Sequence, residues 1–281
     1  MKEFEKQYPY WRDEKLKNAT TNIDDCFVEI KNPQKITKNE RGKIIELCKN
    51  NNFVLIQILK QNDYAQNILS INKQLGLIEN DKHLYIGNDN LANISVSKNK
   101  TQNEFIPYTD KKLNWHTDGY YNDCAHRVRS FTLFCNNPAK IGGKNHWLDI
   151  EILYILLRER SPDIIKYLSL IDAMTIPAHI KDNEILRAES TNAIFLIDKK
   201  TSSLYMRYTQ RKKNIIFNPL SIESINELDE VLSINSPYHF SFKMESGQGI
   251  ITNNVIHTRD SFENDVNNPR SMLRGRYFAR I

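Results

Sequence analysis

The second half of the chain, from Ile94 onward, is a succession of short runs of strand-forming residues, and this texture constrains the fold more than any other feature. The runs are 130–135 (SFTLFC), 193–197 (AIFLI), 203–208 (SLYMRY), 239–244 (HFSFKM), 249–257 (GIITNNVIH) and 271–281 (SMLRGRYFARI). Many short strands accompanied by helices are typical of a double-sheet β fold, in which a jelly roll removes exposed strand edges. We therefore predict a mainly β fold with flanking α-helices and a double-stranded β-helix core of the jelly-roll, cupin-like type.

Helical patterns precede and interrupt these strands. Thr37 and Glu40 match a capping box, which predicts a helix that runs to about Asn50. An apolar run at 53–59 indicates a strand. Further helices are predicted at 64–77, 149–160, 162–170 and 221–232.

The chain has 281 residues, of which 40% are hydrophobic, so it can bury one large core. No repeat or linker divides the sequence, and we predict one domain over residues 1–281. Its expected parts are a lead-in segment (1–36), a helix–strand–helix segment (37–93) and the β core (94–281) with a helical insertion (149–170). The lead-in segment is polar, contains Pro9 and is expected to wrap the core.

The start of the chain, MKEFEKQYPYWRDEKLK, is charged throughout and lacks the apolar segment of a secretory signal. The longest apolar stretch, 150–157, is interrupted by Glu151 and is too short to span a bilayer. The cysteines form no CxxC pair, which favours free thiols over a disulfide framework or a zinc knuckle. We expect a cytoplasmic protein without a membrane partner.

The formal net charge is +5, but acidic residues lie between the basic ones along most of the chain. That distribution favours small anionic ligands over nucleic acid. The expected partner is a small-molecule substrate, and association into a homo-oligomer is left open.

The segment LNWHTDGYY places His116 and Asp118 two positions apart. On an extended backbone this spacing puts both side chains on the same face, so that one metal ion can take both. A chance pairing of a surface histidine with a turn aspartate explains this motif alone equally well. His257 ends a mostly apolar run, where a structural core histidine is the better explanation of that residue alone.

A third element changes the interpretation of both motifs. Arg270 lies 13 residues after His257 (270 − 257), within a final strand that also carries Arg274. Two imidazoles and one carboxylate form the ligand set of non-heme Fe(II) oxygenases. Arginine suits the distant carboxylate of a 2-oxoglutarate molecule bound at such an iron, because its charged fork binds carboxylates in a bidentate manner.

The segments WHTD, HTR and RSMLR, in this order, resemble the taurine/2,4-D dioxygenase (TauD/TfdA-like) family of Fe(II)/2-oxoglutarate oxygenases over about residues 108–281. The resemblance implies that His116, Asp118 and His257 form the catalytic iron site. It also implies that Arg270 binds the far carboxylate of 2-oxoglutarate.

Two further cofactor contacts follow from the same resemblance. Many relatives have GGxT where this chain has GGKN, so the amide of Asn145 would replace a threonine hydroxyl that contacts 2-oxoglutarate. Arg274, the second arginine of an RxxxR pair, would contact the anionic group of the substrate or of 2-oxoglutarate. A salt bridge at the rim is the alternative for Arg274.

The implied cofactors are Fe(II), 2-oxoglutarate and O₂, and the implied reaction hydroxylates or desaturates a small anionic or amino-acid-like metabolite with release of succinate and CO₂. The gap of 139 residues between Asp118 and His257 (257 − 118) favours the small-molecule branch over nucleic-acid dealkylases. Halogenating relatives have alanine or glycine at the aspartate position, so halogenation is not expected.

Arg274, Arg207 and Tyr120 are predicted to face the substrate, although core packing explains Tyr120 equally well. Two other classes stay open. A cupin-like isomerase or hydrolase could use Zn²⁺ or Mn²⁺ at the same three ligands, but it would leave Arg270 without a task. A non-catalytic binding protein could use the basic stretch RYTQRKK on an acidic partner.

Overall fold

Two β-sheets organise the chain in a computed structural model that describes residues 2–59, 63–82, 85–87, 90–181, 184–213 and 215–281. The larger sheet has the order β1-β2-β16-β5-β19-β3, with bounds Phe27–Ile30, Phe53–Ile58, Gln248–Thr252, Ser130–Asn137, Ser271–Tyr277 and Ala92–Ile94. The second has the order β15-β7-β17-β4, with bounds Phe240–Phe242, Asn145–Leu148, Ile256–Arg259 and Leu113–His116. Only β1 and β2 pair in parallel within these two sheets.

Shorter strands complete the β structure. They are β8 (Met174–Ile176) with β11 (Ser190–Asn192) and β14 (Ile216–Phe217), β9 (His179–Lys181) with β10 (Glu184–Arg187), β12 (Phe195–Ile197) with β13 (Leu204–Met206), and β6 (Ile141–Gly142) with β18 (Phe262–Glu263).

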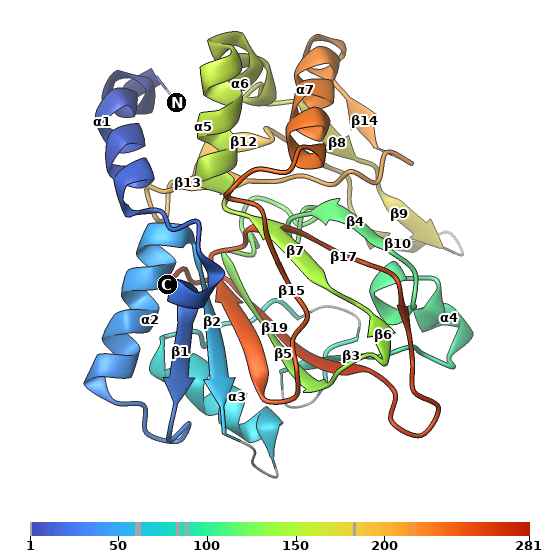
Figure 1. Cartoon of the computed structure of the whole chain (residues 1–281). Helices are drawn as coiled ribbons and strands as arrows, with labels where there is room; N and C mark the ends of the chain where they lie inside the picture. The colour runs from blue at the N-terminus through green and yellow to red at the C-terminus, as the bar shows by residue number, and fades with distance from the viewer. Residues whose placement is uncertain (1, 60–62, 83–84, 88–89, 182–183, 214) are drawn as a thin grey trace.

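Helices lie around the sheets (Figure 1). They are α1 (Lys2–Asn18), α2 (Lys38–Asn51), α3 (Tyr64–Gln74), α4 (Lys100–Asn103), α5 (Ile150–Arg160), α6 (Pro162–Leu168) and α7 (Ile222–Ser233), with 3₁₀ turns η1 (Ile23–Cys26), η2 (Ile106–Tyr108) and η3 (Pro219–Ser221). Figure 1 shows α5, α6 and α7 side by side and α2 beside the β1–β2 edge. The prediction of a mainly β fold with flanking helices is confirmed.

Strand β2 shows how the sequence separates the layers. Phe53 and Leu55 belong to the core between the two large sheets, whereas Val54 and Ile56 belong to the core under α2 and α3. Successive side chains of a strand point to opposite faces, so a continuously apolar strand can supply both cores. A third core lies among α5, α6, α7 and the short strands.

Most predicted elements form close to their expected bounds. Thr37 and Glu40 make the capping box that starts α2, and Ser161 caps α6. The prediction of one strand over 249–257 is wrong, because this run contributes to two strands, β16 and β17, which lie in different sheets. Asn254, with φ of 55°, bends the backbone between them.

The lead-in segment is more regular than expected, since its first half is helix α1 and η1 and β1 follow. Tyr8, Trp11 and Lys15 recur at helical spacing and face α5, where Tyr8 and Trp11 surround Tyr154. Pro9 stays exposed. The helix forms although Pro9 removes one backbone hydrogen bond, because packing of its other face against α5 stabilises it by more than that bond. In the expected helix–strand–helix segment, residues 60–62, 83–84 and 88–89 lie outside the described residues.

None of the helices in the described ranges is long and apolar enough to cross a bilayer. The four cysteines are free, as predicted, and only Cys124 is exposed.

Candidate metal centre and adjoining cavity

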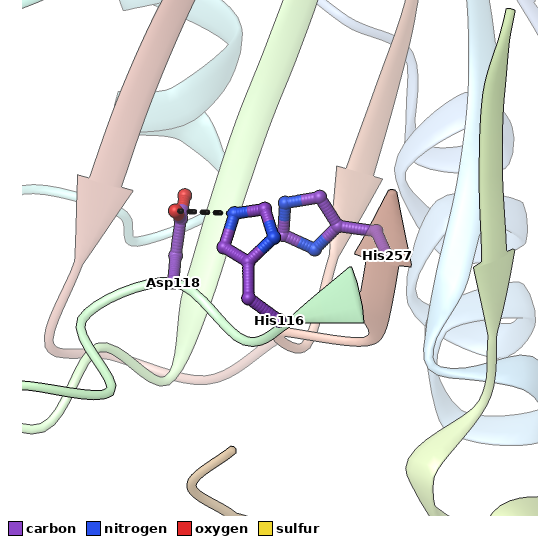
Figure 2. A group of neighbouring side chains, drawn as sticks. All are labelled: His116, Asp118 and His257. Carbon is purple, nitrogen blue, oxygen red and sulfur yellow. Dashed lines mark ion pairs between the residues drawn. The ribbon is translucent and has the colours of Figure 1, made fainter. Parts of the chain in front are cut away.

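Two histidines face each other across neighbouring strands of the smaller sheet. His116 ends β4, and His257 of β17 is its register partner. Their ring centroids lie 4.3 Å apart, and Figure 2 shows both imidazoles beside the Asp118 carboxylate. Antiparallel pairing thus joins motifs that lie far apart in the sequence.

Backbone carbonyls fix the tautomer of both imidazoles. Nδ1 of His116 lies 2.9 Å from the carbonyl oxygen of Asn114, and Nδ1 of His257 lies 2.9 Å from that of Val255. A carbonyl only accepts, so each Nδ1 must carry hydrogen and each Nε2 keeps its lone pair for a ligand. Burial, helped by the neighbouring His257, lowers the pKa of His116 to about 3, and burial also lowers the pKa of His257. Both rings are therefore neutral, as metal ligands must be.

Asp118 sits on a turn that only glycine can follow. Gly119 has φ of +66°, and a Cβ there would approach Cγ2 of Val128 to 2.5 Å. The side chain of Asn254 accepts from the Asp118 N–H at 2.8 Å and donates to the Asp118 carbonyl at 3.0 Å. Backbone geometry, and not side-chain packing alone, fixes where this carboxylate points.

The Asp118 carboxylate is buried beside two cations. Burial would raise its pKa, but Arg274 and Arg276 outweigh that effect and hold the pKa below the usual range of a carboxyl. Arg274 Nη1 lies 3.4 Å from Oδ1, whereas the buried Oδ2 has no hydrogen-bond partner in the described chain. An unpartnered buried carboxylate oxygen is costly unless something else occupies it.

Ligand atoms of His116, Asp118 and His257 all lie within 4.8 Å of one another. His116 Nε2 is 3.9 Å from Asp118 Oδ1, the contact dashed in Figure 2. Two free imidazole nitrogens and one orphaned carboxylate oxygen fit a divalent ion such as Fe(II), and three ligands on one side leave coordination positions for other molecules.

A cavity of about 170 Å³ is lined by two of these residues, His116 and Asp118. Aromatic side chains form much of its wall, and its cationic lining residues are Arg211, Arg274 and Arg276. Arg276 is held by the Tyr121 hydroxyl at 2.9 Å and by an ion pair with Asp81. Among the described residues, Arg274 has an ion pair with Asp118 alone, and Arg211 has an ion pair with no carboxylate.

Arg270 and Asn145 lie in a second region, outside the lining of this cavity. Arg270 is 3% exposed, its Nη1 has no hydrogen-bond partner among the described residues, and burial lowers its pKa to about 10. Asn145, in β7, is buried opposite Arg259 of β17. Gly143 packs here with φ of +71°, and its Cβ would come within 3.6 Å of Arg270 Nε. Gly143 therefore lies beside the Arg270 guanidinium, and its positive φ favours glycine there.

Arg207 does not line the cavity, which corrects the prediction that it faces the substrate. It is 3% exposed, and it donates to the backbone carbonyls of Met174 and Ser190 at 2.7 Å each. Arg211, four residues later, lines the cavity instead, as does the predicted Tyr120. The alternation of β13 does not extend beyond Met206, so the strand period could not indicate which arginine turns inward.

Sequence reasoning also missed Asn254 and Arg276. Arg276 could have been predicted, because residues two apart on a strand share a face and Arg274 had already been assigned to the site. The role of Asn254 depends on a left-handed backbone conformation that no local pattern of the run indicated.

Solved structures of several oxygenases share this fold. An asparagine oxygenase in complex with Fe(II), 2S,3S-3-hydroxyasparagine and succinate has a TM-score of 0.62 at 14% identity, covering 86% of this chain and 79% of that chain. The non-heme iron oxygenase OrfP in complex with Fe, succinate and (3S)-hydroxy-L-Arg has a TM-score of 0.63 at 12% identity, with coverage of 87% and 82%. A taurine dioxygenase from Burkholderia xenovorans has a TM-score of 0.59 at 14% identity, with coverage of 89% and 86%.

No curated protein matches the chain by sequence. The sequence model described as "Taurine catabolism dioxygenase TauD, TfdA family" matches residues 22–276, which is most of the chain.

Proposed function

This chain belongs to the taurine catabolism dioxygenase TauD, TfdA family, and from that premise we propose that it oxidises a small anionic or amino-acid-like metabolite at an iron ion held by His116, Asp118 and His257. The family consists of 2-oxoglutarate-dependent non-heme iron dioxygenases, so the chain is an oxidoreductase that uses Fe(II), 2-oxoglutarate and O₂. Family membership removes the isomerase, hydrolase and non-catalytic alternatives that the sequence left open.

One observation carries the assignment of the ligands. Two neutral imidazoles with free Nε2 atoms and the Asp118 carboxylate, whose buried Oδ2 has no partner in the described chain, offer ligand atoms within 4.8 Å of one another beside a cavity with arginines in its wall. Iron and 2-oxoglutarate, when bound, would supply an oxidation in which O₂ is the oxidant: one oxygen atom goes to succinate as 2-oxoglutarate loses CO₂, and the other serves to oxidise a substrate C–H bond. The residues of the chain orient both molecules and keep water out.

We assign the distant carboxylate of 2-oxoglutarate to Arg270. Its buried, unpartnered Nη1 and its lowered pKa are what a guanidinium shows when an anion would complete its surroundings. Gly143 lies beside its Nε. Asn145, in the same region, is proposed to donate its amide to 2-oxoglutarate in place of the threonine of relatives.

The substrate anion is assigned to Arg274, with Arg211 and Tyr120 as further contacts. When Asp118 binds iron, its charge is directed to the metal and the Arg274 guanidinium becomes available. The aromatic wall of the cavity favours an apolar or planar body between the charged groups. The hydroxyasparagine and hydroxyarginine bound in the two oxygenases of similar fold support an amino-acid-like substrate.

Two finer inferences complete the proposal. We infer that the two large sheets form the jelly-roll, double-stranded β-helix core predicted from the sequence, as a single domain. We also infer hydroxylation or desaturation, since Asp118 occupies the position that halogenating relatives leave without a carboxylate. A cytoplasmic location and the lack of nucleic-acid and membrane partners stay predictions.

A metabolite screen tests the proposal. The Fe(II)-loaded protein, 2-oxoglutarate and O₂ are incubated with amino acids, small carboxylates and sulfonates, and succinate is measured. We expect an anionic compound to raise succinate release in wild type and not in His257→Ala. Succinate release that no anion stimulates, or that His257→Ala retains, would contradict the proposed site.

A further inference from the structure

Two buried arginines share one phenyl ring next to the candidate 2-oxoglutarate site. The guanidinium carbons of Arg259 and Arg270 lie 4.8 and 4.9 Å from the ring centroid of Phe262. Arg259 is 4% exposed, Arg270 is 3% exposed and Phe262 is 6% exposed. Stacking on an aromatic face is favourable for each cation, and most strongly so in a desolvated place. The ring is therefore a direct physical link between the two guanidiniums.

Arg259 fastens a segment of the cavity wall. Its Nη2 donates to the carbonyl of Thr109 at 2.9 Å and to that of Lys111, and its Nη1 lies 3.4 Å from that of Pro107. The Phe262 N–H donates to the carbonyl of Asp110 at 3.0 Å. Residues 107–111 are thus tied to the end of β17 and the start of β18 by charge-assisted and backbone hydrogen bonds.

The fastened segment has two neighbours of functional interest. Turn η2, which overlaps its start, lines the cavity with Ile106, Pro107 and Tyr108. Strand β4, which follows it, ends at His116. Stronger or weaker hydrogen bonds from Arg259 to these carbonyls therefore change the rigidity of the cavity wall.

We propose that Arg259 and Phe262 are positioning residues that couple occupancy of the 2-oxoglutarate site at Arg270 to the rigidity of the cavity wall at 105–111. This inference rests on the proposed role of Arg270. Two like charges over one ring repel each other in a buried site. A carboxylate bound to Arg270 offsets that repulsion, so Arg259 stacks more closely and holds its carbonyl partners more firmly. Coupling of this kind is reciprocal, so an ordered wall also strengthens binding of 2-oxoglutarate.

Hydrogen exchange of the full chain measures the coupling without a known substrate. The protein is loaded with Mn(II), with and without 2-oxoglutarate, and amide exchange of peptides covering 105–111 is followed by mass spectrometry. The amides of Phe105, Tyr108 and Thr109 make local hydrogen bonds, so their exchange reports opening of this turn. Affinity for 2-oxoglutarate is measured by calorimetry on the same samples.

We expect 2-oxoglutarate to slow exchange at 105–111 about fivefold or more in wild type, the lower end of typical coupling effects. Phe262→Leu keeps an apolar side chain but loses the ring, so it should bind 2-oxoglutarate and lose the slowing. Phe262→Tyr keeps the ring and should keep the slowing. The control Phe217→Leu changes a phenylalanine that packs against the core among α5, α6 and α7, and it should behave as wild type.

Equal slowing in wild type and Phe262→Leu, or tight 2-oxoglutarate binding in wild type without any change at 105–111, would overturn the coupling and leave the proposed function intact. Absence of 2-oxoglutarate binding to wild type would overturn both. Arg259→Lys keeps the charge but not the planar fork, and it should speed exchange at 105–111 with and without 2-oxoglutarate. Exchange in Arg259→Lys equal to that of wild type would contradict the fastening role of Arg259.

Discussion

The side-chain amide of Asn254 hydrogen-bonds both backbone polar groups of Asp118, at 2.8 Å to the N–H and 3.0 Å to the carbonyl. Nδ2 of Asn254 also donates to the Val128 carbonyl at 2.7 Å, which ties the same amide to the residues just before β5. Asn254 lies three residues before His257, so one side chain fixes the relative positions of the carboxylate and of the histidine proposed to share its metal.

Asn254→Ala should therefore weaken Fe(II) binding without removing a ligand. Loss of a partner that orients a metal ligand typically costs about 10- to 100-fold in metal affinity. Anaerobic Fe(II) titration checks this. Asn137→Ala is the matched control, because Asn137 also donates to two backbone carbonyls, those of Asn268 and Pro269, away from the centre. Equal affinities of the two variants would argue against a role for Asn254.

Arg270→Ala and Arg274→Ala should have different effects. Removing Arg270 leaves the distant carboxylate of 2-oxoglutarate unpaired, which costs about 2 to 5 kcal/mol, or roughly thirty- to several-thousand-fold in affinity. Arg274→Ala should mainly weaken the substrate and uncouple 2-oxoglutarate decarboxylation from product formation. Titration of 2-oxoglutarate at fixed iron separates the two variants, and equal, small changes would mean that neither arginine serves the site.

Arg211→Gln and Arg207→Lys should separate substrate binding from stability. Arg211 is exposed at the cavity, so its loss should raise the KM of an anionic substrate and leave the melting temperature unchanged. Arg207 holds two buried carbonyls, and lysine cannot reproduce its planar fork. Arg207→Lys should therefore lower the melting temperature by several degrees. A KM effect confined to Arg207→Lys would reverse these assignments.

Lys15→Met should destabilise the fold. Its Nζ lies 2.5 Å from Asp149 and 2.7 Å from Glu151, all largely buried, and Arg280 at 3.5 Å from Glu151 is the remaining cation there. Breaking a buried pair costs about 3 to 5 kcal/mol in the free energy of unfolding. Urea unfolding measures this, with exposed Lys17→Met as the control.

The Lys15→Met deficit should depend on pH with a defined sign. Burial already raises the pKa of Asp149, although Lys15 opposes the rise. Without Lys15 the folded-state pKa rises further above the unfolded value of about 4. The deficit should be smallest near that unfolded value and grow as pH rises through the folded pKa. A deficit that is constant from pH 5 to 8 would contradict this explanation.

Local patterns predicted what depends on local chemistry. The cap at Thr37, the strand runs and the pair His116 and Asp118 could be found in the sequence, because capping, alternation and the HxD spacing are local. His257 could be assigned only together with Arg270 and the family resemblance. The break at Asn254 could not be predicted, since its left-handed conformation is held by bonds to Asp118 and Val128. Helix α1 was missed because Lys15 and its aromatic neighbours are stabilised by α5, which lies far away in the sequence.

Anaerobic titration of Fe(II) into wild type and His257→Ala, followed by 2-oxoglutarate, tests the proposed metal centre. We expect one Fe(II) per chain in wild type and a weak metal-to-ligand charge-transfer band in the visible region when 2-oxoglutarate is added. We expect His257→Ala to lose both. Undiminished Fe(II) affinity in His257→Ala, or a wild type that shows no band at saturating 2-oxoglutarate, would contradict the proposed iron site.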